Sequence, residues 1–260
     1  MATKTVWVAF GVLVTTFALA PSARADFMYG DLDGDHVTYL QVTEGSSTDP
    51  GSKLYSTPQV ADDALVFHPA SFNAIANGGG YDFTEATLTT TVVAKNSSRI
   101  DKIVFTERGD WTLLGNTGTA ATMVGVAGNL ILSILEIDRV SVSPITVSTS
   151  LAFDPFTGNF NLIDHRGNAQ PWNGSVTVDL DEAIIAAGRS GRASKVAISL
   201  GNNLYAFSEP GTVAQIKKKN VNGVTITAVD LVPEPSTFVL LAVGGLGLAL
   251  AALRRCRRPQ

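Results

Sequence analysis

The chain has 260 residues, with 19 Lys and Arg against 23 Asp and Glu, and a formal net charge of −4. Its one cysteine is Cys256, so the sequence before it excludes disulfide bonds, thiol nucleophiles and cysteine-based metal sites. Between Asp26 and Glu234 the chain keeps 13 basic residues against all 23 acidic ones, a net charge of −10. This acidic balance argues against nucleic acid and anionic lipid as partners.

Residues 1–25 have the three parts of a secretory signal peptide. Lys4 supplies the positive charge, Val6 to Leu19 the apolar run, and Ala23-Arg24-Ala25 the small-residue pattern of a cleavage site. The apolar run is too short to span a membrane. We therefore expect export, with cleavage by signal peptidase between Ala25 and Asp26.

Residues 26–231 are predicted to form one all-β ectodomain, a single β-sandwich or jelly roll. Short segments rich in Val, Ile, Thr and aromatic residues alternate with Gly, Asn, Asp and Pro turns. Gly201-Asn202-Asn203 is interpreted as a hairpin turn between two of these segments. The expected strands are Val37 to Glu44, Thr87 to Ala94, Ile100 to Glu107, Leu130 to Val140, Val142 to Phe153, Phe160 to Ile163, Ser175 to Leu180, Val196 to Leu200, Leu204 to Ser208, Val213 to Lys219 and Val224 to Val229.

One segment of the ectodomain favours a helix. Asp181 to Ala187 follows Asp179, and either Asp179 or Asp181 is a suitable N-cap. Gly188 is the expected stop.

The sharpest metal candidate is Asp31-Leu32-Asp33-Gly34-Asp35, which has three carboxylates on alternate residues. It resembles the start of a calcium loop of EF-hand or dockerin type, but His36 replaces the glycine of position six and Val42 the acid of position twelve. We therefore favour a solvated acidic turn at Asp31, Asp33 and Asp35 over a calcium site. The three histidines show no ligand spacing, so no metal and no cofactor is predicted.

The ectodomain tryptophans are candidates for stacking on sugar rings. Trp111 lies in Asp110-Trp-Thr-Leu-Leu114 and is expected in the core, whereas Trp172 lies in Gln170-Pro-Trp-Asn-Gly174, which is typical of a turn. Trp172 is therefore the predicted carbohydrate contact. Lys217, Lys218 and Lys219 are interpreted as a charge run on a strand near a sheet edge, where it blocks aggregation.

The C-terminal residues 232–260 have three parts in a fixed order. Pro233-Glu234-Pro235 comes first, then residues 237–253 without a charge, and then a basic cluster that includes Arg254 and Arg255. The uncharged part is long enough for a transmembrane helix, and the arginines are expected to stay on the cytoplasmic side. Taken without the Pro-Glu-Pro triplet, this is the pattern of a plain C-terminal membrane anchor.

With the triplet, the tail resembles the PEP-CTERM sorting domain of exported bacterial proteins, which an exosortase recognises and is thought to cut at or near Pro-Glu-Pro. The resemblance implies that Pro233, Glu234 and Pro235 are read during sorting, and that the membrane holds the protein until processing. The ectodomain is faintly similar to uncharacterised planctomycete ectodomains in residues 37–44, 107–115 and 160–162.

These patterns predict an exported protein of the cell envelope or extracellular matrix with a structural or adhesive role, and exopolysaccharide as a candidate partner. One alternative is a carbohydrate-binding β-sandwich module. Another is a hydrolase with a carboxylate pair that no motif reveals. The sequence favours a protein that is not an enzyme, and no nucleic acid is expected as a partner.

Overall fold

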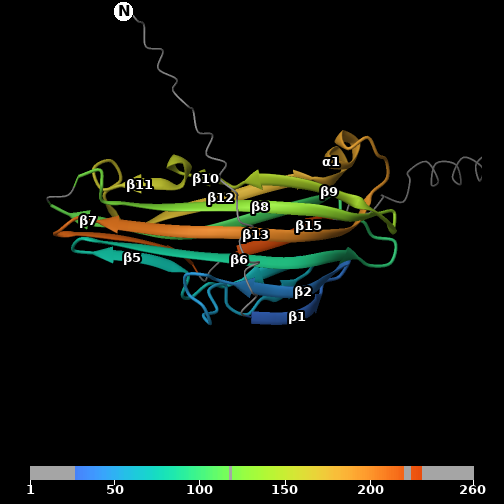
Figure 1. The fold of residues 1–260 in the computed structure, drawn as a ribbon, viewed down its shortest axis with the longest axis horizontal. Coiled ribbons are helices and arrows are strands. Elements are labelled where there is room, and N and C mark those ends of the chain that lie inside the picture. The colour runs from blue at the N-terminus through green and yellow to red at the C-terminus, as the bar shows by residue number, and fades with distance from the viewer. Residues whose placement is uncertain (1–26, 117–118, 220–223, 230–260) are drawn as a thin grey trace, which may run out of the picture.

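The computed structural model describes residues 27–116, 119–219 and 224–229. Two antiparallel sheets face one another along the long axis of the molecule, and in Figure 1 β6, β13 and β8 run side by side. The seven-stranded sheet has the order β1 (Phe27–Asp33), β2 (Val37–Gly45), β6 (Gly80–Ala94), β13 (Ala193–Ser208), β8 (Met123–Ile137) and β11 (Asn159–Asn161), and β9 (Val140–Ser150) also pairs with β8.

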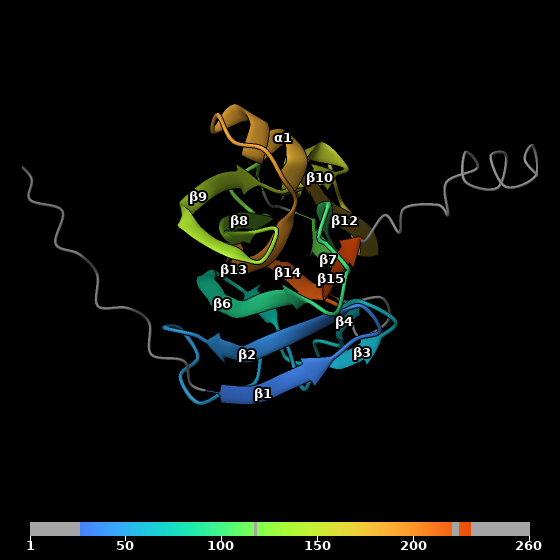
Figure 2. The same cartoon turned by 90° about the vertical axis from the view of Figure 1, so that its right-hand side faces the viewer.

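The second sheet has eight strands, and Figure 2 shows the two layers end-on. Its order is β10 (Ala152–Asp154), β12 (Gly167–Asp179), β7 (Lys102–Gly115), β15 (Val224–Val229), β4 (Ala64–Phe67) and β3 (Gln59–Ala61), while β14 (Thr212–Lys218) pairs with β7 and with β5 (Asn73–Asn77). The predicted all-β class is confirmed.

The core fills the space between the two sheets because side chains alternate along each strand. On β13, for example, Val196, Ile198, Leu200 and Leu204 point inward and are buried, while their neighbours point outward. The same alternation on β6 buries Ala86, Leu88 and Val92. The alternate side chains of β6 and β13 point away from the core and form part of the outer face of the seven-stranded sheet.

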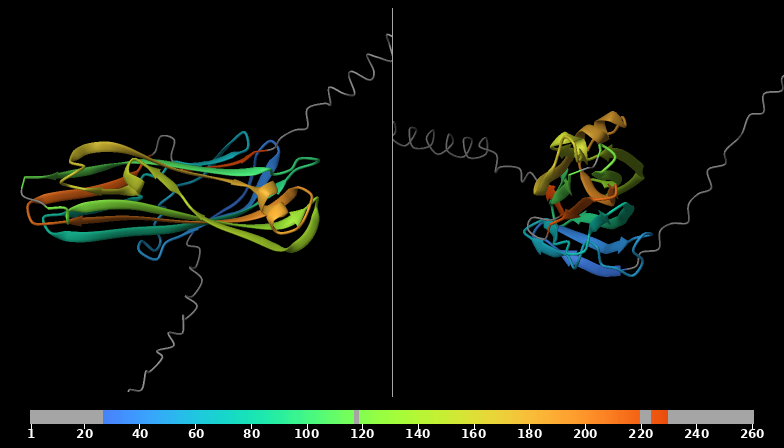
Figure 3. Two further views of the ribbon diagram at one scale, coloured as in Figure 1. Left: turned by 90° about the horizontal axis from the view of Figure 1, so that it is seen from above. Right: turned by 90° about the vertical axis from the view of Figure 1, so that its left-hand side faces the viewer.

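The helix α1 (Leu180–Ala186) confirms the helical prediction to within one residue at each end. The side chain of Asp179 accepts a hydrogen bond from the backbone N–H of Glu182, as an N-cap does, and Gly188 has a positive φ of 71° just beyond the helix. Figure 3 shows α1 at one end of the long axis. A short 3-10 helix, η1 (Phe156–Gly158), follows β10.

The predicted hairpin turn at Gly201-Asn202-Asn203 is wrong. These residues lie in the middle of β13, where Gly201 pairs with Thr87 on one side and with Asn129 on the other. Two full-length neighbours supply hydrogen bonds along the whole strand, and these outweigh the local turn propensity of Gly and Asn. The turn that the sequence reading missed is Asp138-Arg139, where two successive positive φ angles connect β8 to β9.

Several predictions lie outside the described residues. These are the signal peptide with Ala23 and Ala25, and the tail with Pro233-Glu234-Pro235, the span 237–253, Arg254 and Arg255. Among the residues that are described, no helix is long and apolar enough to cross a membrane.

Candidate functional site

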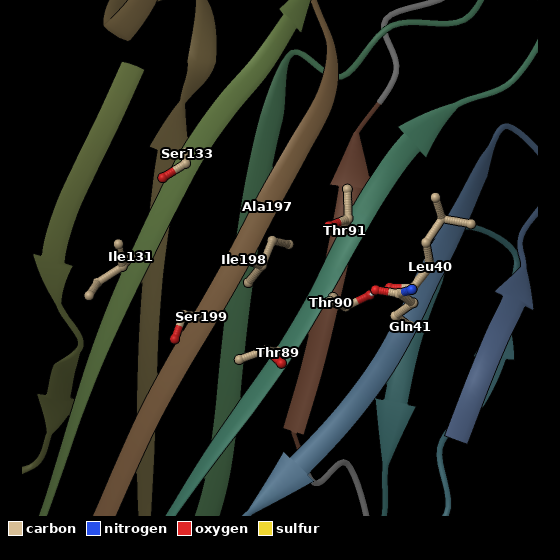
Figure 4. Close-up of a pocket in the computed structure, with 10 residues that line it drawn as sticks. All are labelled: Leu40, Gln41, Thr89, Thr90, Thr91, Ile131, Ser133, Ala197, Ile198 and Ser199. Carbon is tan, nitrogen blue, oxygen red and sulfur yellow. The ribbon is translucent and has the colours of Figure 1, made fainter. Parts of the chain in front are cut away.

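The open face of the seven-stranded sheet is lined by small hydroxyl-bearing side chains. A shallow groove of about 290 Å³ crosses four strands there, as Figure 4 shows. The strand register places Ile131, Ser199 and Thr89 in one row across β8, β13 and β6. Ser133, Ala197, Thr91 and Leu40 form the next row, which ends on β2. Such a surface offers hydroxyl donors and acceptors without bulky obstruction.

Aromatic side chains gather at one end of this open face, the end away from α1. The register aligns Phe207 with Tyr81, and Tyr205 with Phe83, on the same outward side of β13 and β6. Tyr81 is 66% exposed and Phe207 is 40% exposed. A cluster of large rings left open to solvent is a feature of interaction surfaces.

Tyr205 is held in place across β8. Gly125 lies beneath its ring, because a Cβ built at Gly125 would lie 2.3 Å from Cζ of Tyr205. The Tyr205 hydroxyl donates a hydrogen bond to Oδ1 of Asn159 at 2.6 Å. Burial raises the pKa of Tyr205, so the hydroxyl stays protonated and remains a donor. The ring is thus fixed at both ends before any ligand arrives.

A hollow of about 340 Å³ lies beside this ring. It is lined by Ala120, Met123, Val124, Asn159, Phe160, Asn161 and Tyr205. The lining combines apolar surface with two side-chain amides, and its described residues include no carboxylate. An aromatic face with amides at its edge suits a ring-shaped ligand that carries several hydroxyl groups.

Glu209 fixes the loop that forms one wall of the hollow. Its carboxylate accepts hydrogen bonds from the backbone N–H of Thr119 at 2.6 Å and from the Thr122 hydroxyl at 2.9 Å. These hydrogen bonds, led by that from the Thr119 N–H, hold the pKa of Glu209 below its ordinary value. Ala120 lies between the two threonines, so the charge of Glu209 supports this side of the hollow.

The three N-terminal aspartates do not converge on one point. Asp31 accepts a hydrogen bond from the backbone N–H of Gln41, and Asp33 pairs with Lys95 at 2.8 Å. The hydrogen bond from Lys95 is the main reason that the pKa of Asp33 is lowered. Asp35 lies in the turn between β1 and β2. Within the described part of the chain, no group of three His, Cys, Asp or Glu side chains could hold a metal ion.

The predicted surface position of Trp172 is wrong. Its side chain is fully buried, and its ring packs edge-on against that of Phe153, with ring centroids 6.0 Å apart. The segment looked like a turn because of its Pro and Gly, yet residues 170–179 pair continuously with β7. Pro171 fits there because β10 pairs with β12 only at residues 173–175, which leaves Pro171 without a second neighbouring strand.

Trp111, in contrast, lies in the core as predicted. It stacks on Phe160 with ring centroids 3.9 Å apart, and its Nε1 donates to the backbone carbonyl of His165. Both tryptophans therefore belong to the interior. The aromatic residues of the open face are Tyr81, Phe83, Tyr205 and Phe207, which the sequence reading did not select.

The lysine run lies on a strand near a sheet edge, as predicted, because β14 is next to β5, which pairs with no other strand among the described residues. The strand β14 lies between β5 and β7, so it is not an edge strand. Lys217 points outward, but Lys218 points into the sandwich, where its Nζ lies 2.6 Å from Oε2 of Glu107. A buried contact between an amine and a carboxyl group does not follow from the sequence, because it depends on the pairing of two distant strands.

Comparison with known proteins identifies one motif. The PEP-CTERM protein-sorting motif matches residues 231–258, which include Pro233-Glu234-Pro235, Arg254 and Arg255. The match supports the prediction that the chain is exported to the cell envelope as an exosortase substrate. The fold and the motif together define an exported all-β protein that carries a PEP-CTERM tail. The likeness of the ectodomain to planctomycete proteins stays a prediction.

No curated protein matches the chain in sequence. Among solved structures, TmCBM61 in complex with beta-1,4-galactotriose is 8% identical, covering 80% of this chain and 100% of that one, with a TM-score of 0.25. The Emp47p carbohydrate recognition domain is 9% identical over 82% and 100% of the two chains, with a TM-score of 0.26. Endoglucanase 3 of Trichoderma harzianum, from family GH12, is 10% identical over 80% and 96%, with a TM-score of 0.24. Superpositions as loose as these carry no conclusion about function.

Proposed function

We propose that the ectodomain is an adhesive component of the cell envelope or extracellular matrix, and that it binds carbohydrate on the open face of the seven-stranded sheet. The PEP-CTERM tail delivers the protein to the envelope, and the open face provides the contact surface there. Binding is the role that the described lining of the hollow beside Tyr205 supports, because that lining combines apolar surface with two side-chain amides.

The observation that carries this proposal is the fixed orientation of Tyr205. Gly125 beneath the ring and Asn159 at its hydroxyl hold it without help from a ligand. A preorganised aromatic surface loses little conformational entropy on binding, which favours affinity for weakly interacting ligands such as sugars. Tyr81 and Phe207 extend the aromatic surface, and the hydroxyl-lined groove continues it along the sheet.

The shape of the face favours a polymer over a single sugar. The groove and the hollow both lie on the outer side of β13 and β8, so an extended chain could contact both. Serine and threonine hydroxyls along this path replace some of the water bound to sugar hydroxyls. An acidic ectodomain also favours neutral or basic polysaccharide over polyanions.

Binding of purified ectodomain-bearing protein to insoluble envelope or matrix polysaccharide tests the proposal. The variant Tyr205→Ala removes the fixed ring and should weaken binding about tenfold, which corresponds to about 1.4 kcal/mol. Tyr205→Phe keeps the ring but loses the hydrogen bond to Asn159, and it should have a smaller effect.

The control is Ile185→Ala on α1, since Ile185 is a large apolar side chain that is 70% exposed and lies at the other end of the molecule. It should bind like the wild type. Equal binding by wild type and Tyr205→Ala, or no binding by the wild type to any envelope polysaccharide, would overturn the proposal.

A further inference from the structure

A second polar site lies in the interior, between the two sheets. It contains Glu107 of β7 and Lys218 of β14 from the eight-stranded sheet, and Asn202 of β13 from the seven-stranded sheet. Their exposed fractions are 0%, 2% and 2%. An amine, a carboxyl group and a carboxamide seldom share a dry core, because each is costly to remove from water.

The chain topology brings Asn202 opposite Lys218. The strands β13 and β14 are consecutive and are joined by a turn at residues 209–211, although they belong to different sheets. Asn202 and Lys218 lie the same number of residues from the turn. Asn202 is counted back from Ser208, the end of β13, and Lys218 is counted forward from Thr212, the start of β14. Both side chains point inward. Because β13 enters the turn and β14 leaves it, the two side chains face each other across the sandwich.

Glu107 lies between the other two groups. Its Oε2 lies 2.6 Å from Nζ of Lys218, although the contact is poorly aligned as a hydrogen bond. The amide of Asn202 faces the same carboxyl group closely enough to affect its pKa, again without good alignment. Nδ2 of Asn202 also donates to the Tyr55 hydroxyl at 3.0 Å, while Oδ1 has no donor among the described residues.

The surroundings of the amine are apolar and aromatic. Nζ of Lys218 lies 5.2 Å from the ring centroid of Phe72 and 5.1 Å from that of Trp172. Beside Asn202, the absence of a side chain at Gly128 leaves room for the carboxamide, because a Cβ there would lie 2.8 Å from Oδ1. The site is closely packed and holds its groups in a fixed arrangement.

Burial favours the neutral forms of both ionisable groups. It lowers the pKa of Lys218, and the charge of Glu107 offsets this only in part. It raises the pKa of Glu107 against the opposing effect of Lys218. A neutral amine is a nucleophile, and a neutral carboxylic acid is a proton donor.

We propose that the side chains of Lys218 and Asn202 become joined by an intramolecular isopeptide bond, with Glu107 as the acid–base group. Nζ attacks Cγ of Asn202 while Glu107 donates its proton to Oδ1. As the carbonyl re-forms, Glu107 takes the proton back from Oδ1, the Cγ–Nδ2 bond breaks, and Nδ2 leaves as ammonia with one proton from Nζ. One amine and one carboxamide thus yield one secondary amide and one ammonia, and Glu107 ends as it began. No oxidant, metal or second substrate is needed.

The bond would be a covalent cross-link in an ectodomain whose composition excludes disulfide cross-links. The only cysteine is Cys256 in the tail, so the ectodomain has no disulfide available. The amide would link the two sheets through β13 and β14, and it would replace a buried amine and a buried acid–amine contact with one uncharged group. This inference concerns the interior and is independent of the carbohydrate proposal.

Intact mass spectrometry of the exported protein tests the inference directly, with the sequence mass calculated for the residues that remain after processing at both ends. The wild type should be lighter than its sequence mass by one ammonia, and digestion should release one branched peptide that joins the segments containing Asn202 and Lys218. A wild-type mass without this loss overturns the proposal. A loss of ammonia without a branched peptide also overturns it, since an Asn–Gly pair such as Asn173-Gly174 can lose ammonia by cyclising on its own.

Three variants assign the roles. Lys218→Arg removes the nucleophile but keeps a cation, and Glu107→Gln keeps the shape but removes the acid; both should show the full, unlinked mass. Lys217→Arg is the matched control, because Lys217 is the adjacent lysine with an outward side chain, and it should keep the ammonia loss. If a variant does not fold, the wild-type mass and branched peptide still decide the question. A linked peptide in Lys218→Arg would assign the bond to another lysine and overturn the proposal.

Discussion

The two sides of β13 carry polar side chains under opposite constraints. On the outer side, Asn203 and Ser199 lie in partial contact with water, and Tyr205 is anchored to Asn159. On the inner side, Asn202 is buried next to Glu107 and Lys218. A polar group in water costs little, whereas a polar group in the core is costly unless it finds a hydrogen-bond partner. Polar side chains on the open face can therefore change their hydrogen-bond partners, whereas those in the interior keep the same contacts.

The two regions should differ most in how much stability is lost when their aromatic side chains are removed. Trp172→Ala deletes a fully buried ring that contacts Phe153 and Lys218, and it should lower the free energy of unfolding by about 3–5 kcal/mol. Tyr205→Ala deletes a half-buried ring and should cost about 1 kcal/mol. Chemical denaturation of the two variants at one pH makes the comparison.

The same two variants should rank in the opposite order when polysaccharide binding is measured. Folded Trp172→Ala should bind polysaccharide as the wild type does, because its ring does not reach the surface, whereas Tyr205→Ala should not. If the two variants lost stability equally, the assignment of one ring to the core and the other to the open face would fail.

Two glycines provide a smaller and cleaner contrast. A Cβ at Gly109 would lie 2.0 Å from the backbone oxygen of Lys217 and 2.4 Å from the Trp172 ring, so Gly109→Ala should cost about 1–3 kcal/mol. A Cβ at Gly201, on the outer side of β13, would meet nothing within 4 Å. Gly201→Ala should be neutral or slightly stabilising, by about 0.5 kcal/mol, because alanine restricts the unfolded chain. Thermal unfolding of the pair measures both, and a loss in Gly201→Ala equal to that in Gly109→Ala would contradict this packing.

The sequence predicted those parts of the fold that depend on local signals. The bounds of β15 and the start of β2 follow from runs of β-branched residues, and α1 follows from an acidic N-cap and a glycine stop. Strand lengths were underestimated, as for β7, which continues through Asp110 and Trp111 to Gly115. Charged and glycine residues end a strand in a local reading, but inside a sandwich the neighbouring strands extend it.

The candidate sites could not be located from the sequence, because both depend on register. Tyr205 and Phe83 become neighbours only when β13 pairs with β6, and Lys218 meets Glu107 only when β14 pairs beside β7. One signal was available: Lys218 has the same strand parity as Ala214 and Ile216, which places it on the inner face. The interpretation of all three lysines as a charge run that blocks aggregation does not take that alternation into account.

The smallest expected effect is a pH response of the loop beside the hollow. Hydrogen bonds from Thr119 and Thr122 keep the pKa of Glu209 below its ordinary value of 4.5, so the folded state favours the charged form. The contribution of these bonds to stability is therefore fully present above pH 4.5, and it is lost as the pH falls through the lower pKa of the folded state. The backbone amide resonances of Thr119 and Thr122 should shift with a midpoint below 4.5. Glu209→Gln should abolish this titration, and Glu182→Gln on α1 should leave it unchanged. A midpoint at or above 4.5 would mean that Glu209 does not hold the loop, and the wall of the hollow at Ala120 would then need another support.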